Sequence, residues 1–373
     1  MSAATPTLVD VEDVRPRIDE LLTSHVAQLR TVLAAASEDA DVLADAVAQI
    51  LTGGKRLRAA FCYWSWRAHG GVAGTAEAAA VLRVGAALEL FQAAALFHDD
   101  VMDDSDTRRG FPAAHRAFAG LHAQHGLTGD AERFGMSAAI LLGDLTLIAS
   151  EQEFAGALAL QPVQRAERAR AVFDLMRTEV TVGQYLDVLA QALPWGDDPA
   201  RDETRAREVI RAKAARYSVE HPIVLGAALA DADERELEAC RRLGLPLGEA
   251  FQLRDDLLGV FGDPQTTGKP AGDDLREGKR TVLTARAVAR ARAVGDDATV
   301  QLLRDRLGDR SLSDADVARL AAAIGSTGAP DDVETLIDDL AGRAFALMDG
   351  RPWTEPARTQ LVGLAHAAVD RRA

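Results

Sequence analysis

Cysteines, aromatic residues and strand-like alternation are all scarce in this 373-residue chain. The two cysteines, Cys62 and Cys240, are too few for a disulfide framework, so we expect a reducing compartment. Aromatic residues make up 5%, and alternating β-branched runs bounded by turn residues are missing, which disfavours a sheet. The longest apolar stretch, residues 84–97, is interrupted by Glu89 and Gln92 and is too short to span a bilayer. The N-terminus does not resemble a signal peptide. These features predict a cytoplasmic protein without stable membrane insertion.

Basic residues are also under-represented. The chain has 42 Lys and Arg against 57 Asp and Glu, a net charge of −15. A field of that sign repels nucleic acid and anionic membranes, so we expect no nucleic-acid partner. Any polyanionic ligand must be held by a local group of cations or by bound metal ions.

Helical periodicity is present along the whole length. Apolar residues make up 48% of the chain and recur at three- and four-residue spacing in alanine-rich segments. The pattern predicts roughly a dozen helices, with irregular breaks at residues 120–135, 193–204 and 262–278. Composition does not change across these breaks, so we predict a single all-α domain over residues 1–373. The third break contains Lys269 and three aspartates and is followed directly by Lys279, and we expect it to be functional.

The densest acidic segment reads HDDVMDDSDTRRG over residues 98–110. Asp99 and Asp103 are four residues apart, as are Asp100 and Asp104, so each pair shares one face of a helix. Repulsion within the pairs and the negative end of the helix dipole each cost ~0.3–1 kcal/mol, and a divalent cation would reverse both effects. Mg²⁺ prefers carboxylate oxygens and keeps positions for phosphate oxygens. We interpret the segment as a metal site, with a solvated acidic helix end as the alternative.

A second acidic segment, FQLRDDLLG, occupies residues 251–259. Gln252, Asp255 and Asp256 fall on one face of a helix. An Asp pair on a helix is common, but together the two segments predict acidic helix faces opposed across a cleft, with metal ions between them.

Cations stand close to both acidic segments. The motif GGKRLR at residues 53–58 allows backbone amides and side chains to converge on one anion. Arg108 and Arg109 follow the first segment directly, and Lys213, Lys269 and Lys279 lie near the second. The combination predicts phosphate held between metal ions and cations; structural salt bridges are the alternative.

Taken in order, these motifs resemble the trans-isoprenyl diphosphate synthases, or polyprenyl synthetases, over residues 50–283. The set is GGKRLR, HDDVMDDSDTRRG, GQYLD, a Lys-led helix, FQLRDD and TGKPAGDDLREGKRT. The resemblance implies an all-α bundle around a deep central cavity and a homodimer. It implies condensation of isopentenyl diphosphate with an allylic diphosphate, here to geranylgeranyl diphosphate (C20), and three Mg²⁺ ions per site.

The resemblance also implies roles for individual residues. The isopentenyl diphosphate site would consist of Lys55, Arg58, Arg109 and Gln92, the last at a position where His or Gln is usual. The Mg²⁺ ligands would be Asp99, Asp103 and Asp255, supported by Asp100 and Asp256. The leaving diphosphate would be held by Arg108, Lys213 and Lys269, with Gln252 and Lys279 in the same group and Gln184 and Asp187 lining the opposite wall. The catalytic set would be Asp99, Asp103, Arg108, Lys213 and Lys269.

Three positions depart from the family pattern. Gly259 stands where the second motif usually has a third aspartate, and Asp273 or Asp274 could compensate. Ala214 follows Lys213 where Thr is usual, and Ala59 stands where the first basic motif often has Pro.

Product length in the family is set on the helix before the first aspartate. Ala94 and Ala95, five and four residues before Asp99, are small, whereas aromatics there give short products. Phe91, eight residues before Asp99, is the next candidate floor of the tunnel. The pattern predicts a C20 product, with longer chains possible; close helix packing is the alternative reason for the alanines.

Three other functions compete with this interpretation. A class I terpene cyclase shares the fold and the first aspartate motif, but the sequence has GGKRLR and lacks the Asn/Ser/Glu metal triad of cyclases. A non-catalytic partner subunit would typically lose the aspartate motifs, which are intact here. A metal-binding helical protein without phosphate chemistry would not need the matched cations.

Overall fold

The computed structural model describes residues 10–196, 198–262 and 272–370, and these are predominantly helical. The first half contains α1 (Val14–Ala36), η1 (Glu38–Ala40), α2 (Asp41–Leu51), α3 (Leu57–Ala68), α4 (Ala76–Met102), α5 (Ala114–Gln124), α6 (Ala131–Leu158) and α7 (Val163–Ala192). The second half contains α8 (Pro199–Val209), η2 (Ile210–Glu220), α9 (His221–Leu229), α10 (Glu234–Phe261), α12 (Asp273–Glu277), α13 (Val282–Ala293), α14 (Asp297–Arg306), α15 (Asp314–Ser326), α16 (Ala329–Asp349) and α17 (Ala357–Val369). Within the described residues, strands are limited to the hairpin of β1 (Thr107–Arg108) and β2 (Phe111–Pro112). The all-α prediction is confirmed.

Two of the predicted breaks are shorter than expected, because helices begin inside them. The Asp130 side chain accepts a hydrogen bond from the backbone N–H of Arg133 and caps α6. Asp198 caps α8 in the same way, with Pro199 at the first helical position. The third break contains the short helix α12, and its residues 263–271, including Lys269, lie outside the described part of the chain.

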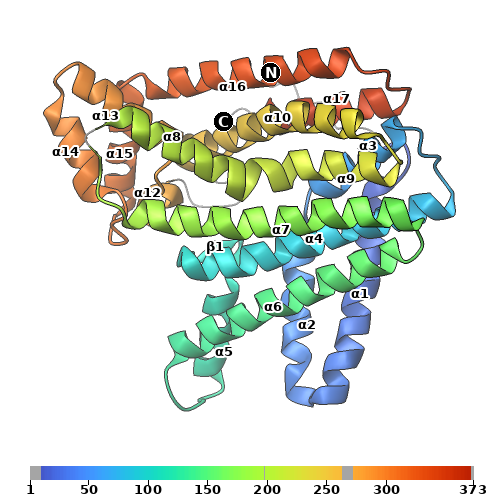
Figure 1. Ribbon diagram of the computed structural model, residues 1–373. Helices are drawn as coiled ribbons and strands as arrows, with labels where there is room; N and C mark the ends of the chain where they lie inside the picture. Colours follow the sequence, from blue (N-terminus) through green and yellow to red (C-terminus); the bar gives the residue numbers. More distant parts are fainter. Residues whose placement is uncertain (1–9, 197, 263–271, 371–373) are drawn as a thin grey trace, which may run out of the picture.

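Helix α4 runs through the middle of the fold, with α6 packed along it (Figure 1). Small residues allow this close approach: a side chain at Gly143 of α6 would collide with the His98 ring of α4. The His98 ring therefore packs between α4 and α6. The hairpin of α1 and α2 projects from one side of the body, and α16 crosses the opposite side.

Two helices are long and apolar enough to span a membrane by length and composition alone, α4 and α6. The sequence prediction considered only the shorter run within α4, so it missed both. In α4, 78% of the apolar window is buried inside the protein, which identifies it as a core helix. In α6 only 44% is buried, and its remaining apolar side chains face outward.

Helices α3, α4, α10, α17 and the segment η2 border a cavity of about 1390 Å³. The segment η2 is a π-helix that runs directly into Pro222 of α9. Proline lacks a backbone N–H and its ring crowds the preceding turn, so the wider π-turn relieves the clash. This turn directs Lys213, Tyr217 and Ser218 toward the cavity.

Candidate active site

The first acidic segment lies where α4 ends, and the first four of its five aspartates have different surroundings. Asp99 lines the cavity, whereas Asp103 is 2% exposed at the C-cap of the helix. Asp100 is 1% exposed and accepts a hydrogen bond at 2.7 Å from Nε of Arg108. Asp104 leaves the helix with a φ of +51° and pairs with Arg116 at the surface. Asp99 and Asp103 therefore keep the helical arrangement predicted from the sequence. Asp104 has left the helix, so it does not share a helix face with Asp100.

Asp99 is surrounded by donors. Lys213 Nζ lies 2.9 Å from Asp99 Oδ1, and the Gln184 amide donates to the same oxygen at 3.1 Å. Burial raises the pKa of Asp99, but the charges of Lys213, Lys279 and Arg108 outweigh it and hold that pKa well below its usual range. The carboxylate is therefore ionised at physiological pH.

The second acidic segment lies on α10 and faces the same cavity. Asp255 and Asp256 both line it, and Gln252 donates to Asp256 at 2.9 Å. Burial, followed by the nearby charge of Asp274, raises the pKa of Asp256 to about 7.

Asp274 occupies the space beside Gly259. A Cβ added at Gly259 would lie 2.1 Å from Oδ2 of Asp274, so the glycine leaves room for this carboxylate. Asp274 lines the cavity together with Asp255 and Asp256. The structure thus brings a third carboxylate to the second motif from α12.

Lys279 links the first acidic segment to α12. Its ammonium lies 3.1 Å from Asp103, 3.5 Å from Asp274 and 2.7 Å from Glu277. Burial alone would lower the pKa of Lys279, but these carboxylates raise it well above its ordinary value. Glu277 also accepts a hydrogen bond from Ser105 at 3.0 Å, which links the loop after α4 to α12.

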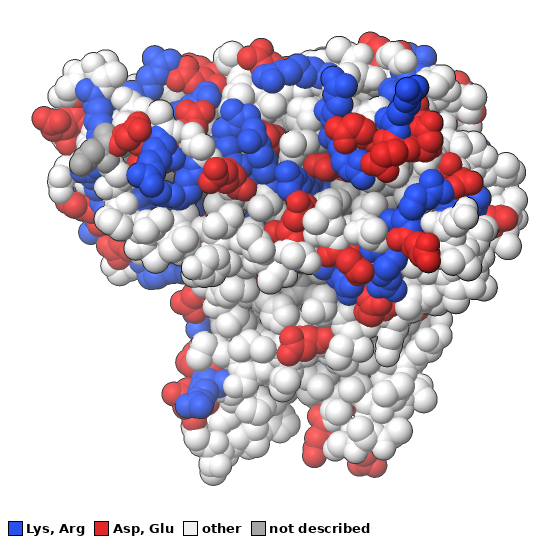
Figure 2. Space-filling view, viewed as in Figure 1, with Lys and Arg blue, Asp and Glu red and all other residues white. Residues whose placement is uncertain are grey.

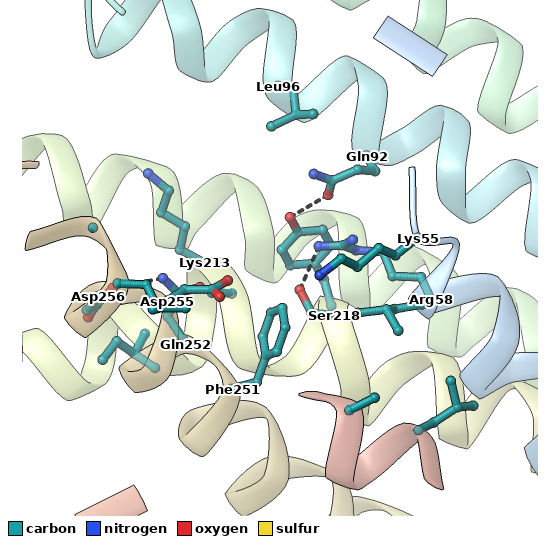
Figure 3. Close-up of a pocket in the computed structure, with 18 of the residues that line it drawn as sticks. Lys55, Arg58, Gln92, Leu96, Lys213, Ser218, Phe251, Gln252, Asp255 and Asp256 are labelled. Atoms are coloured by element: carbon teal, nitrogen blue, oxygen red, sulfur yellow. Dashed lines mark hydrogen bonds between the residues drawn. The ribbon is translucent and has the colours of Figure 1, made fainter. Parts of the chain in front are cut away.

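The basic group from the first motif lies at another wall of the cavity (Figure 3). Lys55 and Arg58 line this wall, and Arg58 donates to Oγ of Ser218 at 2.7 Å. The Tyr217 hydroxyl donates to Oε1 of Gln92 at 2.6 Å, and the Arg58 guanidinium carbon lies 4.3 Å from the centre of the Tyr217 ring.

Arg109 differs from its predicted position. Its φ of +54°, followed by Gly110, turns the side chain away from the described cavity lining. Its guanidinium donates to the carbonyls of Ile50 and Thr52, the latter at 3.1 Å. In this structure Arg109 therefore secures the backbone before Lys55.

The predicted product-length positions, Phe91, Ala94 and Ala95, lie on α4 outside the described cavity lining. Phe91 and Ala94 are 5% and 2% exposed, and Ala95 is half-buried. Among the described residues, Leu96 lines the cavity from this part of α4, whereas these three do not. Phe91 packs edge-on against Phe173 and Tyr217, with ring centres 6.5 Å and 6.3 Å apart.

Several residues at the site carry no motif that predicts them. Tyr217 and Ser218 follow Lys213 by four and five residues. Apart from this helical spacing, nothing in the sequence indicates that they border the cavity. Glu277 begins the EGKRT segment at residues 277–281, but a single glutamate there does not predict a role. Arg310, which donates to the carbonyl of Asp103, lies in a C-terminal region without motifs.

The donor set fits hard cations. The carboxylate oxygens of Asp103 are buried and, apart from the ion pair of Oδ2 with Lys279 at 3.1 Å, have no hydrogen-bond partner. Among the described residues, no three carboxylate, histidine or cysteine side chains are gathered closely enough to enclose a metal ion. Mg²⁺ held by one or two carboxylates and by substrate phosphates requires no such enclosure, so the arrangement is compatible with it.

Comparisons with known proteins agree with this site. The family model described as polyprenyl synthetase matches residues 40–324. The geranylfarnesyl diphosphate synthase of Aeropyrum pernix is 30% identical over 84% of this chain and 89% of its own length. The octaprenyl diphosphate synthase of Escherichia coli is 30% identical over 86% of each chain.

A solved structure is similar along almost the whole chain. It is the geranylgeranyl pyrophosphate synthase of Corynebacterium glutamicum, complexed with isoprenyl diphosphate and magnesium. It is 36% identical with a TM-score of 0.90, and the match covers 98% of this chain and 100% of that one. This chain belongs to the polyprenyl synthetase family and is an isoprenyl diphosphate synthase, a prenyltransferase.

Proposed function

We propose that this enzyme condenses isopentenyl diphosphate with an allylic diphosphate to make geranylgeranyl diphosphate, in a Mg²⁺-dependent reaction. The supporting observation is that the Lys55–Arg58 group and both aspartate segments border one cavity. Two diphosphates could be held side by side there, one by cations and the other between the acidic helices.

The chemistry follows from these residue types. The bond between the allylic carbon and the diphosphate oxygen breaks, and the negative charge that grows on the oxygen is stabilised by Arg108, Lys213 and Lys279. Lys269 would join them, although it lies outside the described residues. Mg²⁺, bound by Asp99, Asp103 and Asp255 with support from Asp100 and Asp256, would supply further charge stabilisation.

The second substrate completes the reaction. Lys55 and Arg58 hold isopentenyl diphosphate so that its double bond attacks the allylic cation and forms the new carbon–carbon bond. A proton is then lost, and the departed diphosphate is the nearest available base. No serine, cysteine or histidine nucleophile takes part.

Product length is the finer part of the proposal. The relatives are named as geranylfarnesyl, octaprenyl and geranylgeranyl diphosphate synthases, so similarity alone leaves the product length open. The small side chains of Ala94 and Ala95 above the large ring of Phe91 favour C20.

We also propose a single-domain, cytoplasmic homodimer. Apolar side chains on the outer faces of α6 and α7 include Ile140, Leu141, Ile148, Leu175 and Val182, which are 45–61% exposed. Figure 2 shows few charged side chains over α6. A second copy of the chain covering this surface would bury it. Cys62 and Cys240 are buried free thiols, as suits a reducing compartment.

A product assay tests the proposal. Purified protein, Mg²⁺ and labelled isopentenyl diphosphate are incubated separately with dimethylallyl, geranyl and farnesyl diphosphates, and products are resolved by chain length. We expect a C20 diphosphate. A shorter or longer product would contradict the Phe91 floor, and release of a hydrocarbon without elongation would indicate a terpene cyclase.

A further inference from the structure

Tyr217 contacts two of the residues predicted to bind isopentenyl diphosphate, one through its hydroxyl and the other through the face of its ring. Its hydroxyl lies 2.6 Å from Oε1 of Gln92 on α4, and its face lies under the guanidinium of Arg58 on α3. No motif in the sequence assigns this tyrosine a role. It lies on the π-helix η2, which directs it toward the cavity.

The hydroxyl contact fixes the orientation of the Gln92 amide. Two oxygen atoms at 2.6 Å require a proton between them, and the amide oxygen can only accept, so Tyr217 donates. The amide nitrogen of Gln92 is then directed away from the tyrosine, as Figure 3 shows. An amide held this way presents two N–H donors, the groups that an anionic diphosphate requires.

The ring contact orients Arg58. A guanidinium stacked on an aromatic face keeps its N–H donors in a plane parallel to the ring. Nη2 of Arg58 is engaged by Ser218 at 2.7 Å, a neighbour of Tyr217 on the same turn. Nε of Arg58 is buried without a hydrogen-bond partner. The guanidinium is therefore held in place by the ring of Tyr217 and the hydroxyl of Ser218.

We propose that Tyr217 is the positioning residue of the isopentenyl diphosphate subsite: its hydroxyl sets the Gln92 amide and its ring sets the Arg58 guanidinium. This inference rests on the proposed function, which places isopentenyl diphosphate at Lys55 and Arg58, and on the family resemblance, which assigns Gln92 to the same site. Because Tyr217 contacts Gln92 and Arg58 directly, we expect the larger effect on isopentenyl diphosphate.

The test separates the hydroxyl from the ring. Binding of isopentenyl diphosphate is measured calorimetrically, and KM is measured for each substrate. Loss of one hydrogen bond predicts that Tyr217→Phe weakens isopentenyl diphosphate binding about 3- to 10-fold. Tyr217→Leu also removes the stacking surface and should weaken binding further. KM for farnesyl diphosphate should change less than about twofold in Tyr217→Phe, which keeps the ring contact with Phe91.

A double-mutant cycle identifies the route of the effect. If Tyr217 acts through Gln92, then Tyr217→Phe should cost almost nothing in a Gln92→Ala background. A full, additive effect in that background would overturn the proposal, as would equal weakening of both substrates.

Two further variants complete the design. Tyr63→Phe is the matched control, because it also removes a tyrosine hydroxyl from a hydrogen bond. That hydroxyl donates to Glu12 at 2.5 Å and does not contact Gln92 in the described structure. This variant should lower Tm without changing either KM. Lys55→Ala tests the subsite itself: if it leaves isopentenyl diphosphate binding intact, the proposed function has failed, whereas if it weakens binding and Tyr217→Phe does not, only the role of Tyr217 is wrong.

Discussion

Lys213 Nζ lies 2.9 Å from Oδ1 of Asp99, although 114 residues separate them in the chain. The same ammonium reaches Asp187 at 2.5 Å, so one lysine ties the end of α4 to α7 and η2. Each carboxylate favours the charged ammonium, and their charges overcome the effect of burial and raise the pKa of Lys213. The lysine thus carries its charge throughout the physiological range, as a group that stabilises a leaving diphosphate must.

Asp99→Asn keeps the shape of the side chain and removes its charge. Because the carboxylate is predicted to bind the metal that balances the leaving group, we expect kcat to fall on the order of 10²-fold or more. Initial rates with farnesyl and isopentenyl diphosphates measure this. Asp104→Asn is the matched control, since Asp104 belongs to the same acidic run but is exposed and pairs with Arg116. Equal losses in both variants would contradict the assignment of Asp99.

Asp256 should make the free energy of unfolding of this protein depend on pH. Its ordinary pKa of 3.8 applies to the unfolded chain, and burial and Asp274 raise the folded value to about 7. The folded protein therefore binds the proton more tightly, so the stability that this group contributes is present below about pH 4 and is lost as pH rises toward 7.

Asp256→Asn removes that titration and should keep the contact with Gln252. We expect its Tm relative to wild type, without added metal, to increase from pH 5 to pH 8, and then to level off. Asp339→Asn, at an exposed position, provides the baseline. A difference between Asp256→Asn and wild type that does not change with pH would show that Asp256 does not titrate in this range.

Restoring the usual third aspartate should reduce activity in this chain. Gly259→Asp would place a side chain where Asp274 already lies, since even a Cβ approaches its carboxylate to 2.1 Å. We expect a several-fold lower kcat from crowding and like-charge repulsion. The double variant Gly259→Asp with Asp274→Ala should recover activity relative to Gly259→Asp alone. No recovery would mean that Asp274 does not take the place of the missing aspartate.

The helical fold and the acidic helix faces could be predicted because both depend on local periodicity. The four-residue spacing of Asp99 and Asp103 needs only an intact helix, and α4 continues to Met102. The breaks were predicted too long because Asp130 and Asp198 read as loop residues, whereas each caps a helix. The role of a polar residue at a helix end depends on which residues follow in helical conformation.

Other features of the site depend on conformations that periodicity does not encode. The positive φ of Arg109 turns its side chain toward the backbone before Lys55, and no pattern of residue types indicates that turn. The π-helix places Tyr217 and Ser218 beside Arg58, because it widens a segment that reads as ordinary helix. Arg310 reaches Asp103 across 207 positions from a region without motifs.

The apolar surface of α6 predicts the oligomeric state. Leu141 and Ile148 are 61% and 56% exposed and lie seven residues apart, on one face of the helix. Leu141→Arg with Ile148→Glu should convert a dimer to a monomer, measured by light scattering after gel filtration. Val294→Glu, at a position that is 80% exposed at the end of α13, should leave the mass unchanged. A wild-type protein that is already monomeric would refute the proposed interface.

Product length should change when the small Ala95 or the large Phe91 on α4 is replaced. Ala95 is half-buried four residues before Asp99, so Ala95→Phe would place a ring in the path proposed for the growing chain, and we expect products shorter than C20. Phe91→Leu removes the ring that packs against Phe173 and Tyr217, and we expect a shift to longer products.

Removing any buried ring repacks the core and could by itself change the product. The control therefore removes a buried ring away from the proposed tunnel. Phe118→Leu on α5 does so, since Phe118 is 7% exposed and lies away from α10 and η2. A large-to-small change in a core costs on the order of 1–3 kcal/mol, so both Phe→Leu variants should lower Tm. Only Phe91→Leu should change the product. If chain length stays at C20 in Phe91→Leu and Ala95→Phe alike, the tunnel does not follow this face of α4, and the alanines serve close packing against α6.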